Sequence, residues 1–275
     1  MKKLIMSSLA IAVITSCSST NDEVSEIING IDNTINTPYL VKKFTETTQD
    51  NQVIVTEYKY DGDKIIEEKN ITQNRRIAYT YAGDNIATAE TYAGTTLEQK
   101  REFTYLNGKL TAEKVTSKAD PTTSQMMVYT VNYQYLTSTQ VKFNRYAGAT
   151  VNPSGGYTAV FDDVEASLSS NGNLASTKYT NNGTTYYLNN TFDNDNNPMR
   201  NVKGYVKINM FYDTELGHNN LISQSRNHVG ALNGTGSIKG EYTLNSAKYP
   251  TKVIMKFTSS SFGSNNHTYN YEYNK

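Results

Sequence analysis

The stretch Tyr58-Lys59-Tyr60-Asp61-Gly62-Asp63-Lys64-Ile65 places an aromatic pair, a tight turn and an aliphatic residue within eight positions. The same order returns at residues 79–86 (YTYAGDNI) and at residues 103–110 (FTYLNGKL). In each copy the aliphatic residue stands five positions after the second aromatic, and successive copies begin 21 and 24 residues apart. A degenerate fourth copy begins at Tyr133. A fixed internal period of this kind indicates repeated supersecondary units.

Alternation of side chains shows what the repeated unit is. Ile77, Tyr79 and Tyr81 lie on one face of an extended strand, with Ala78 and Thr80 on the other. The glycine in each turn supplies the positive φ that a tight hairpin requires. Further turns are predicted at three Asn-Gly pairs: Asn171-Gly172, Asn182-Gly183 and Asn233-Gly234. Each unit is therefore a β-hairpin.

A single hairpin is marginally stable in water, so several must pair edge to edge. The sequence predicts an all-β domain over residues 39–275, an antiparallel meander of about 10–12 strands. Free edges of such a meander invite aggregation, which favours a strongly curved sheet or a closed barrel. The aromatic residues at period two are expected to form the core of this sheet.

The first residues are typical of an export signal. Met1-Lys2-Lys3 is cationic, and the apolar stretch that follows is too short to span a membrane. It ends in Ile14-Thr15-Ser16-Cys17, which resembles the bacterial lipobox. The resemblance implies cleavage between Ser16 and Cys17, removal of residues 1–16, and lipid on the Cys17 sulfur. The alternative is an ordinary secreted protein that carries Cys17 as a free thiol.

Residues 17–38 are interpreted as the lipidated cysteine and a polar tether. Ser18 stands where an inner-membrane retention signal would have Asp. Asp22-Glu23 resemble the surface-export signal of Bacteroidota lipoproteins. These residues predict an outer-membrane lipoprotein on the cell surface. Two or three acyl chains on Cys17 would anchor the chain stably.

The repeats resemble the YD-type repeats of bacterial and animal surface proteins. The later motifs occur in a fixed order: 192–198 (FDNDNNP), 219–223 (NNLIS), 249–253 (YPTKV) and 269–273 (YNYEY). This succession resembles a family of Bacteroidota surface lipoproteins of unknown function with a porin-like β fold. The resemblance covers about residues 39–275 and implies the fold, but no activity.

A membrane-spanning barrel is the alternative to a domain in water, because such barrels also alternate and carry aromatic girdles. The strand faces opposite the aromatic residues, however, carry charged residues, and placing a charged side chain in hydrocarbon costs much free energy. They include Glu57, Lys59, Glu102, Lys252 and Lys256. The chain also ends in Tyr273-Asn274-Lys275 instead of an aromatic residue. The sequence therefore favours the domain in water.

Composition argues against several kinds of partner. Lys and Arg number 26 against 26 Asp and Glu, so no excess of cations exists for nucleic acid. The single cysteine excludes an internal disulfide and a CxxC site. His218, His228 and His267 have no zinc spacing and are expected as solvated residues in or beside turns. No cofactor or metal is expected.

Two acidic segments are candidate sites. Residues 193–197 (DNDNN) are as rich in side-chain oxygen atoms as a calcium-binding loop. The EF-hand pattern, however, requires Gly and Glu at the positions that Pro198 and Gly204 occupy here. An Asx-rich turn without a bound ion is therefore expected. Asp162-Asp163-Val164-Glu165 is the densest acidic run and the candidate for carboxylate catalysis, with a solvated turn as the preferred interpretation. No Gly-x-Ser-x-Gly nucleophile motif is present.

These observations predict a non-enzymatic envelope lipoprotein that displays a β domain and binds a macromolecule or glycan. Its partners are the membrane, through lipid on Cys17, and a glycan or protein ligand whose site the sequence does not identify. Two alternatives stay open. An envelope hydrolase would place paired carboxylates in one concave pocket with one pKa raised. A small-ligand carrier would contain an interior cavity of at least roughly 300 Å³.

Overall fold

The computed structural model describes residues 38–119, 125–261 and 263–275. Predictions for the signal, for Ser16 and Cys17, and for the tether before Pro38 lie outside the described residues. The described residues form an all-β closed barrel of antiparallel strands, as the sequence predicts. Its elements are β1 (Val41–Thr47), β2 (Val53–Asp61), β3 (Lys64–Asn70), β4 (Arg75–Ala82), β5 (Asn85–Ala93), β6 (Thr96–Leu106), β7 (Lys109–Lys118), β8 (Met126–Tyr135), β9 (Gln140–Val151), β10 (Tyr157–Leu168), β11 (Leu174–Asn181), β12 (Thr184–Phe192), α2 (Tyr205–Asn209), β13 (Leu221–Gly230), β14 (Gly234–Leu244), β15 (Pro250–Ser259) and β16 (Gly263–Tyr273).

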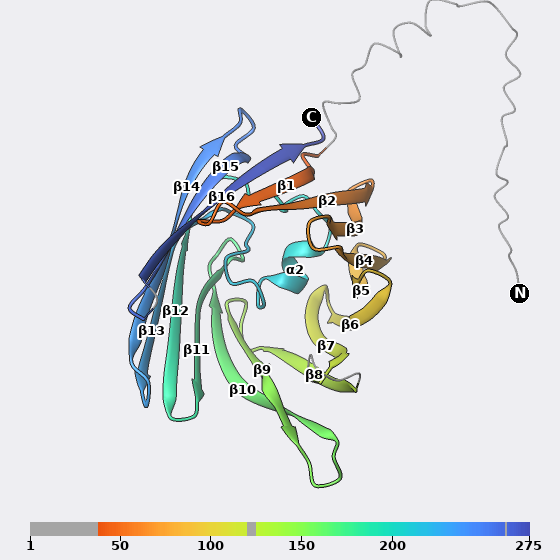
Figure 1. Ribbon diagram of the computed structural model, residues 1–275, viewed down its shortest axis with the longest axis vertical. Coiled ribbons are helices and arrows are strands. Elements are labelled where there is room, and N and C mark those ends of the chain that lie inside the picture. Colours follow the sequence, from red (N-terminus) through yellow and green to blue (C-terminus); the bar gives the residue numbers. More distant parts are fainter. Residues whose placement is uncertain (1–37, 120–124, 262) are drawn as a thin grey trace, which may run out of the picture. The chain divides into compact units, whose positions relative to one another are not determined.

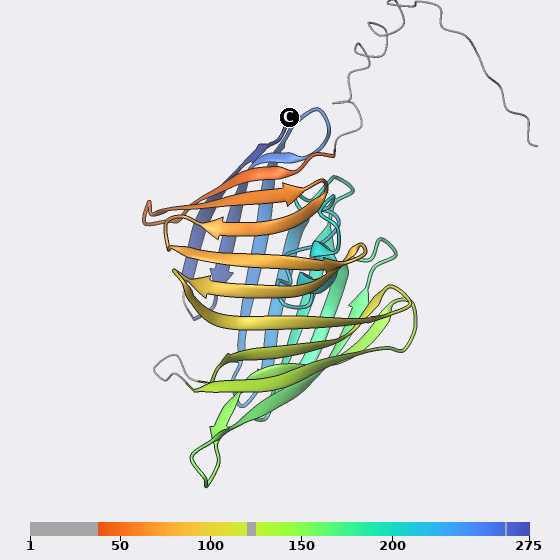
Figure 2. The ribbon, with the colours of Figure 1, turned by 90° about the vertical axis from the view of Figure 1, so that its right-hand side faces the viewer.

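Each strand pairs with the next one along the chain, and β1 pairs with β16 to close the barrel. Val41 lies opposite Tyr273 at this seam, and the Leu40 amide donates to the Asn274 side chain at 3.0 Å. Figures 1 and 2 show the N-terminal strands as one wall and the long strands β11–β15 as the wall facing it. Closure leaves no free sheet edge at which another chain could pair.

The sixteen strands exceed the 10–12 that the sequence predicts, so the strand count was wrong. Each period of 21 or 24 residues contains two strands, for example β2 and β3 around the turn at Gly62. The turns themselves are as predicted, since Gly62, Gly83 and Gly108 all have positive φ. The predicted number allowed about one strand per repeat, whereas each repeat contributes two.

The second aromatic of each repeat ties its hairpin to the preceding one. The Tyr60 hydroxyl donates to the Val41 carbonyl at 2.9 Å, and the Tyr105 hydroxyl donates to the Ile86 carbonyl at 2.8 Å. The Tyr81 hydroxyl accepts from the Ile65 amide at 3.1 Å. The aliphatic residue of each repeat is fully buried inside the barrel. The predicted aromatic core is thus confirmed, with a hydrogen bond added at each step.

The outer face of the barrel carries ion pairs between neighbouring strands. Lys59 lies 2.7 Å from Glu67, and Lys142 lies 3.0 Å from Glu165. A lipid-embedded barrel presents an apolar band outside, where charged groups are costly. These pairs place charged groups on the outer face, where apolar side chains such as Ile66 and Val128 are also exposed. Among the described residues, no helix has the length and apolar character to cross a membrane.

Residues 193–220, which we call the plug, leave the wall between β12 and β13 and fold into the barrel (Figures 1 and 2). The plug contains the short helix α2 and packs apolar side chains against both walls. Val202 and Ile208 are buried beside Ile65 and Ile86, while Phe211 belongs to a second cluster with Val141 and Phe143. The plug fills part of the barrel interior and leaves separate cavities around itself.

Candidate functional site

A cavity of about 610 Å³, which we call the basic cleft, lies between the plug and strands β9–β16. Its apolar wall includes Phe143, Phe211 and Phe257, and hydroxyl side chains such as Thr214 and Ser259 complete its lining. Among its lining residues in the described chain there is no Asp or Glu, whereas the two arginines and one histidine there are Arg145, Arg226 and His228. The cleft therefore has a basic, partly aromatic lining.

Arg145 extends from β9 and is fixed from two sides. One Nη atom lies 2.5 Å from an Asp162 oxygen, whose other oxygen accepts from Asn181 at 2.6 Å. The guanidinium group also stacks on the Tyr179 ring at 3.8 Å. Its Nε atom has no hydrogen-bond partner, although 42% of the side chain is exposed. Arg145 is thus held in place by an ion pair and a stacked ring, and its unpartnered Nε atom is itself buried.

The aromatic wall beside Arg145 is a continuous stack. Tyr179 and Tyr186 are nearly parallel, with ring centroids 4.7 Å apart. His228 follows at 5.6 Å from the Tyr186 ring, tilted by 42°. Because one ring supports the next, the column from Arg145 to His228 is rigid, and a rigid wall loses little entropy when a ligand binds.

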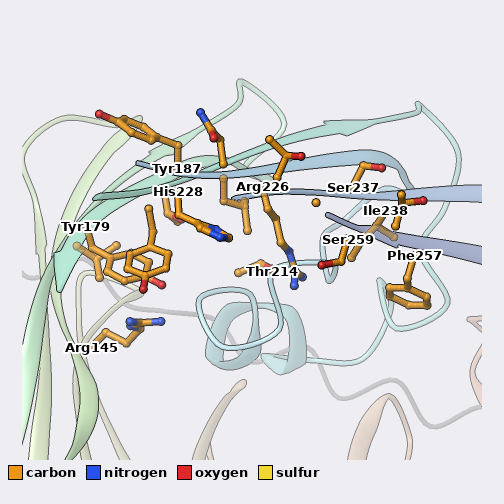
Figure 3. A pocket seen from close by; sticks show the side chains of 18 of the residues that line it. Arg145, Tyr179, Tyr187, Thr214, Arg226, His228, Ser237, Ile238, Phe257 and Ser259 are labelled. Atoms are coloured by element: carbon orange, nitrogen blue, oxygen red, sulfur yellow. The ribbon is translucent and has the colours of Figure 1, made fainter. Parts of the chain in front are cut away.

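Arg226 reaches into the basic cleft from β13, on a different wall from Arg145 (Figure 3). Its Nε atom donates to Gln224, which in turn bonds Asn190 at 2.9 Å and Thr214 of the plug at 3.1 Å. Its side chain is 49% exposed, and the nearest carboxylate oxygen, on Glu215, is 3.6 Å away. Two fixed guanidinium groups therefore face one hollow, an arrangement that binds anions.

A second cavity of about 290 Å³, which we call the acidic cavity, lies on the other side of the plug. Glu68, Asp213 and Glu215 line it, and its described lining contains no Lys, Arg or His. The plug segment 212–215 lies between the two cavities. Tyr212 and Thr214 line the basic cleft, whereas Asp213 and Glu215 line the acidic cavity. One short segment thus divides a basic from an acidic compartment.

Burial sets the protonation of these carboxyl groups. Desolvation, followed by repulsion from Asp213, raises the pKa of Glu215 to about 7. Desolvation also raises the pKa of Asp213, whose accessible surface faces the interior of the barrel. The pKa of Glu68 is raised by burial too, although its carboxylate accepts hydrogen bonds from Tyr79 and Tyr205. No three His, Cys, Asp or Glu side chains of the described ranges converge as metal ligands.

The structure corrects the prediction for two of the three histidines. His228 lies within β13 on the wall of the basic cleft, and His267 lies within β16 and contacts Glu46. All three were expected as solvated residues in or beside turns. His218 does lie in the connecting segment, where burial lowers its pKa.

The acidic run at 162–165 was predicted as a solvated turn, and this was wrong, because it lies in the middle of β10. Asp162 is buried against Arg145. Glu165 is exposed on the outer face and pairs with Lys142. Alternation along the strand sends these two carboxylates to opposite sides of the sheet, so they do not form a catalytic pair.

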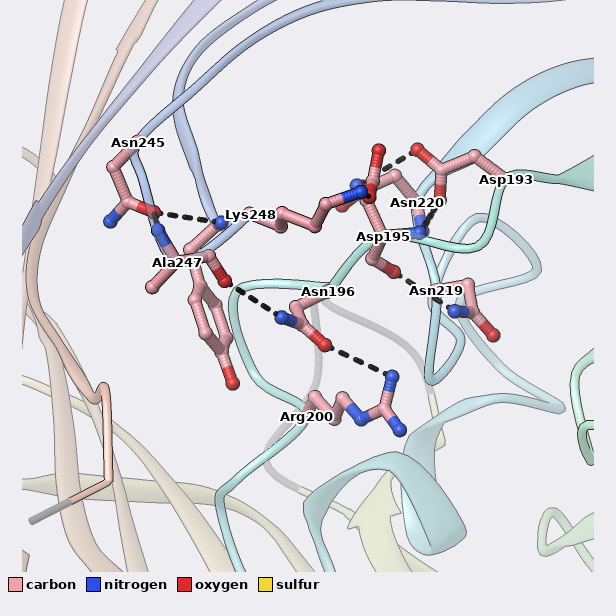
Figure 4. Close-up of polar contacts among 10 residues, drawn as sticks. Asp193, Asp195, Asn196, Arg200, Asn219, Asn220, Asn245, Ala247 and Lys248 are labelled. Carbon is pink, nitrogen blue, oxygen red and sulfur yellow. Dashed lines mark hydrogen bonds and ion pairs between the residues drawn. The ribbon is translucent and has the colours of Figure 1, made fainter. Parts of the chain in front are cut away.

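The Asx-rich segment forms the predicted turn and ties the plug to the wall (Figure 4). The Asp195 amide donates to Asp193 at 2.9 Å, which is the Asx turn. Asn220 donates to the other Asp193 oxygen at 3.0 Å, and Lys248 pairs with Asp195 at 2.9 Å. The oxygen atoms that suggested a calcium loop are therefore engaged by amides and an ammonium group.

Comparison with solved structures finds porin-like proteins. One from Bacteroides vulgatus ATCC 8482 is 16% identical with a TM-score of 0.54, covering 86% of this chain and 99% of that one. Another from Bacteroides uniformis ATCC 8492 is 10% identical with a TM-score of 0.41, covering 86% and 98%. No family model and no curated protein matches the chain. The likeness to the first structure shows a porin-like β-barrel fold, which confirms that part of the family resemblance.

Proposed function

We propose that the chain is a binding protein that holds a short acidic glycan in the basic cleft. The observation that carries the proposal is the pair of fixed arginines, Arg145 and Arg226, in a cleft whose described lining has no carboxylate. A guanidinium group binds a carboxylate through two parallel hydrogen bonds. A sugar acid would supply that carboxylate to either arginine.

The size and the other lining groups support a glycan. A volume of about 610 Å³ lies within the range of roughly 300–1,000 Å³ typical of small-molecule sites. The aromatic wall suits the apolar faces of sugar rings. Hydroxyl and amide groups from the plug, β11, β15 and β16 suit their hydroxyls, namely Thr214, Thr177, Ser259 and Asn265. The cavity fits the small-ligand carrier considered as an alternative, with a polar ligand.

The hydrolase alternative has one supporting observation and one against it. Asp213 and Glu215 share the acidic cavity, and the pKa of Glu215 is raised to about 7. That cavity, at about 290 Å³, is smaller than typical ligand sites, and a glycosidase must hold sugar rings on both sides of the cleaved bond. The cleft of suitable size contains no carboxylate pair. We therefore favour binding without catalysis.

Titration with matched sugars tests the proposal. Digalacturonic acid is expected to bind saturably in isothermal titration calorimetry, and the neutral disaccharide of galactose to bind at least tenfold more weakly. Arg226→Met is expected to weaken digalacturonic acid binding at least tenfold, because it removes one guanidinium from the cleft. Lys142→Met removes a cation from the outer face and serves as the matched control. Equal binding of both sugars, or an unaffected Arg226→Met variant, would contradict the proposal.

We further propose that lipid on Cys17 holds this barrel at the outer membrane, facing outward. The supporting residues are Ile14-Thr15-Ser16-Cys17 and the acidic pair Asp22-Glu23 behind them. A Cys17→Ser variant is expected to leave the membrane fraction, because no other side chain of the chain can form the thioether. Cell fractionation with metabolic labelling by a fatty acid checks this, with Ser18→Ala as control. A Cys17→Ser protein that remains acylated would disprove the anchor.

A further inference from the structure

The acidic cavity gathers three carboxyl groups among tyrosine hydroxyls and asparagine amides. Its carboxylates come from Glu68 on β3 and from Asp213 and Glu215 on the plug, and no cationic side chain is among its described lining residues. The nearest guanidinium to Glu215 is 3.6 Å away on Arg226, beyond ordinary hydrogen-bond distance. A cation inside the cavity could therefore approach Glu215 more closely than Arg226 does.

An independent observation concerns Asn220, whose side chain is only 1% exposed and also lines this cavity. Its Oδ1 atom has no hydrogen-bond partner. Rotation of the amide would not satisfy it, because Nδ2 donates to an Asp193 oxygen at 3.0 Å, and a flip would set two oxygens against each other. A buried acceptor without a donor is costly, so a ligand that donates a hydrogen bond to Oδ1 would gain stability there.

Aromatic rings form the opposite wall of the acidic cavity. Phe44 packs against Tyr269 and Tyr271, with ring centroids 5.4 and 5.2 Å apart, and all three line the cavity. The faces of such rings attract cations within about 6 Å of their centroids. The wall thus suits the alkyl portion of a ligand and its positive charge.

We propose that the acidic cavity binds a primary ammonium group carried by a small organic amine. The ammonium supplies three N–H donors, and the acceptors available to it are Asp213, Glu215 and Asn220 Oδ1. The aromatic wall holds the carbon chain. A volume of about 290 Å³ limits the ligand to a compact amine. This site is separate from the basic cleft and takes a ligand of the opposite charge.

Three probes of similar carbon chain test the proposal on the unmodified protein at pH 8. n-Butylammonium is expected to bind saturably in isothermal titration calorimetry. 1-Butanol keeps the chain without the charge, and butyltrimethylammonium keeps the charge without N–H donors. Each is expected to bind at least tenfold more weakly. Failure of n-butylammonium to bind, or equal binding of 1-butanol, would overturn the proposal without reference to any variant.

Variants then locate the site. Glu215→Gln and Asp213→Asn are nearly isosteric and are each expected to weaken n-butylammonium binding at least tenfold. Glu165→Gln, on the outer face, is the matched control and leaves binding unchanged. Far-UV circular dichroism and urea unfolding are measured on the same variants as a test of folding. Amine binding that survives both cavity variants would assign the ammonium elsewhere and overturn the inference.

Discussion

Arg101→Met is expected to lower the free energy of unfolding by about 3–5 kcal/mol, because it leaves a buried carboxylate without its cationic partner. Arg101 Nε donates to Glu113 at 2.6 Å, and the Glu113 side chain has no exposed surface. The same guanidinium donates to the Ile208 carbonyl at 2.9 Å and to Asn209 at 3.0 Å, at the end of α2. One side chain therefore neutralises a buried acid and fastens the plug to the wall.

Urea unfolding followed by far-UV circular dichroism measures this effect. Arg75→Met removes an arginine that pairs with Glu98 on the exposed side, and it is expected to cost no more than about 1 kcal/mol. The double variant Arg101→Met with Glu113→Leu replaces the whole pair by apolar groups and is expected to recover much of the loss. An Arg101→Met protein as stable as Arg75→Met would show that the pair does not hold the plug.

The hairpin wall could be predicted from the sequence because its signals are local. The aromatic pair, the glycine turn and the aliphatic residue of 58–65 fix two strands and their register without any distant contact. The hydrogen bond between Tyr105 and Ile86 could not be predicted in the same way, because it depends on how neighbouring hairpins stack. Local chemistry specifies the hairpin, and burial between hairpins specifies the barrel.

The plug could not be predicted, because its apolar residues have no period of their own. Val202, Ile208 and Phe211 are buried by strands far away in the chain. Helix α2 has only five residues, too few for a helical pattern to appear. The motif at 192–198 marked the start of this segment, but nothing in it indicates that the chain turns into the barrel.

The arginines of the basic cleft were also missed, for a related reason. Arg145 and Arg226 are 81 positions apart and belong to no motif. The alternation along each strand predicts which residues share a face of the sheet with the arginine. It does not predict which of the two faces lines a cavity. Asp162 could have been a clue, because a carboxylate on the buried face of a strand needs a cationic partner.

The stability of the protein is expected to fall as the pH rises from about 4.5 to about 7, through the titration of Glu215. Its pKa is raised from 4.5 to about 7 on folding, so the unfolded chain releases this proton first. The stabilisation is complete below pH 4.5 and is lost as the pH passes the folded-state pKa. A shift of this size corresponds to about 3 kcal/mol of unfolding free energy.

Comparison with Glu215→Gln isolates this contribution, because Gln keeps the shape of the protonated acid. Asp213, Arg226 and His267 act on Glu215, and they remain in both proteins. The variant is expected to match the wild type near pH 4.5 and to exceed its unfolding free energy by about 3 kcal/mol at pH 8. Glu165→Gln is the control, since Lys142 lowers the pKa of Glu165 and no gain at high pH follows. Parallel stability curves for the wild type and Glu215→Gln across this range would mean that the carboxyl group is not held protonated inside the barrel.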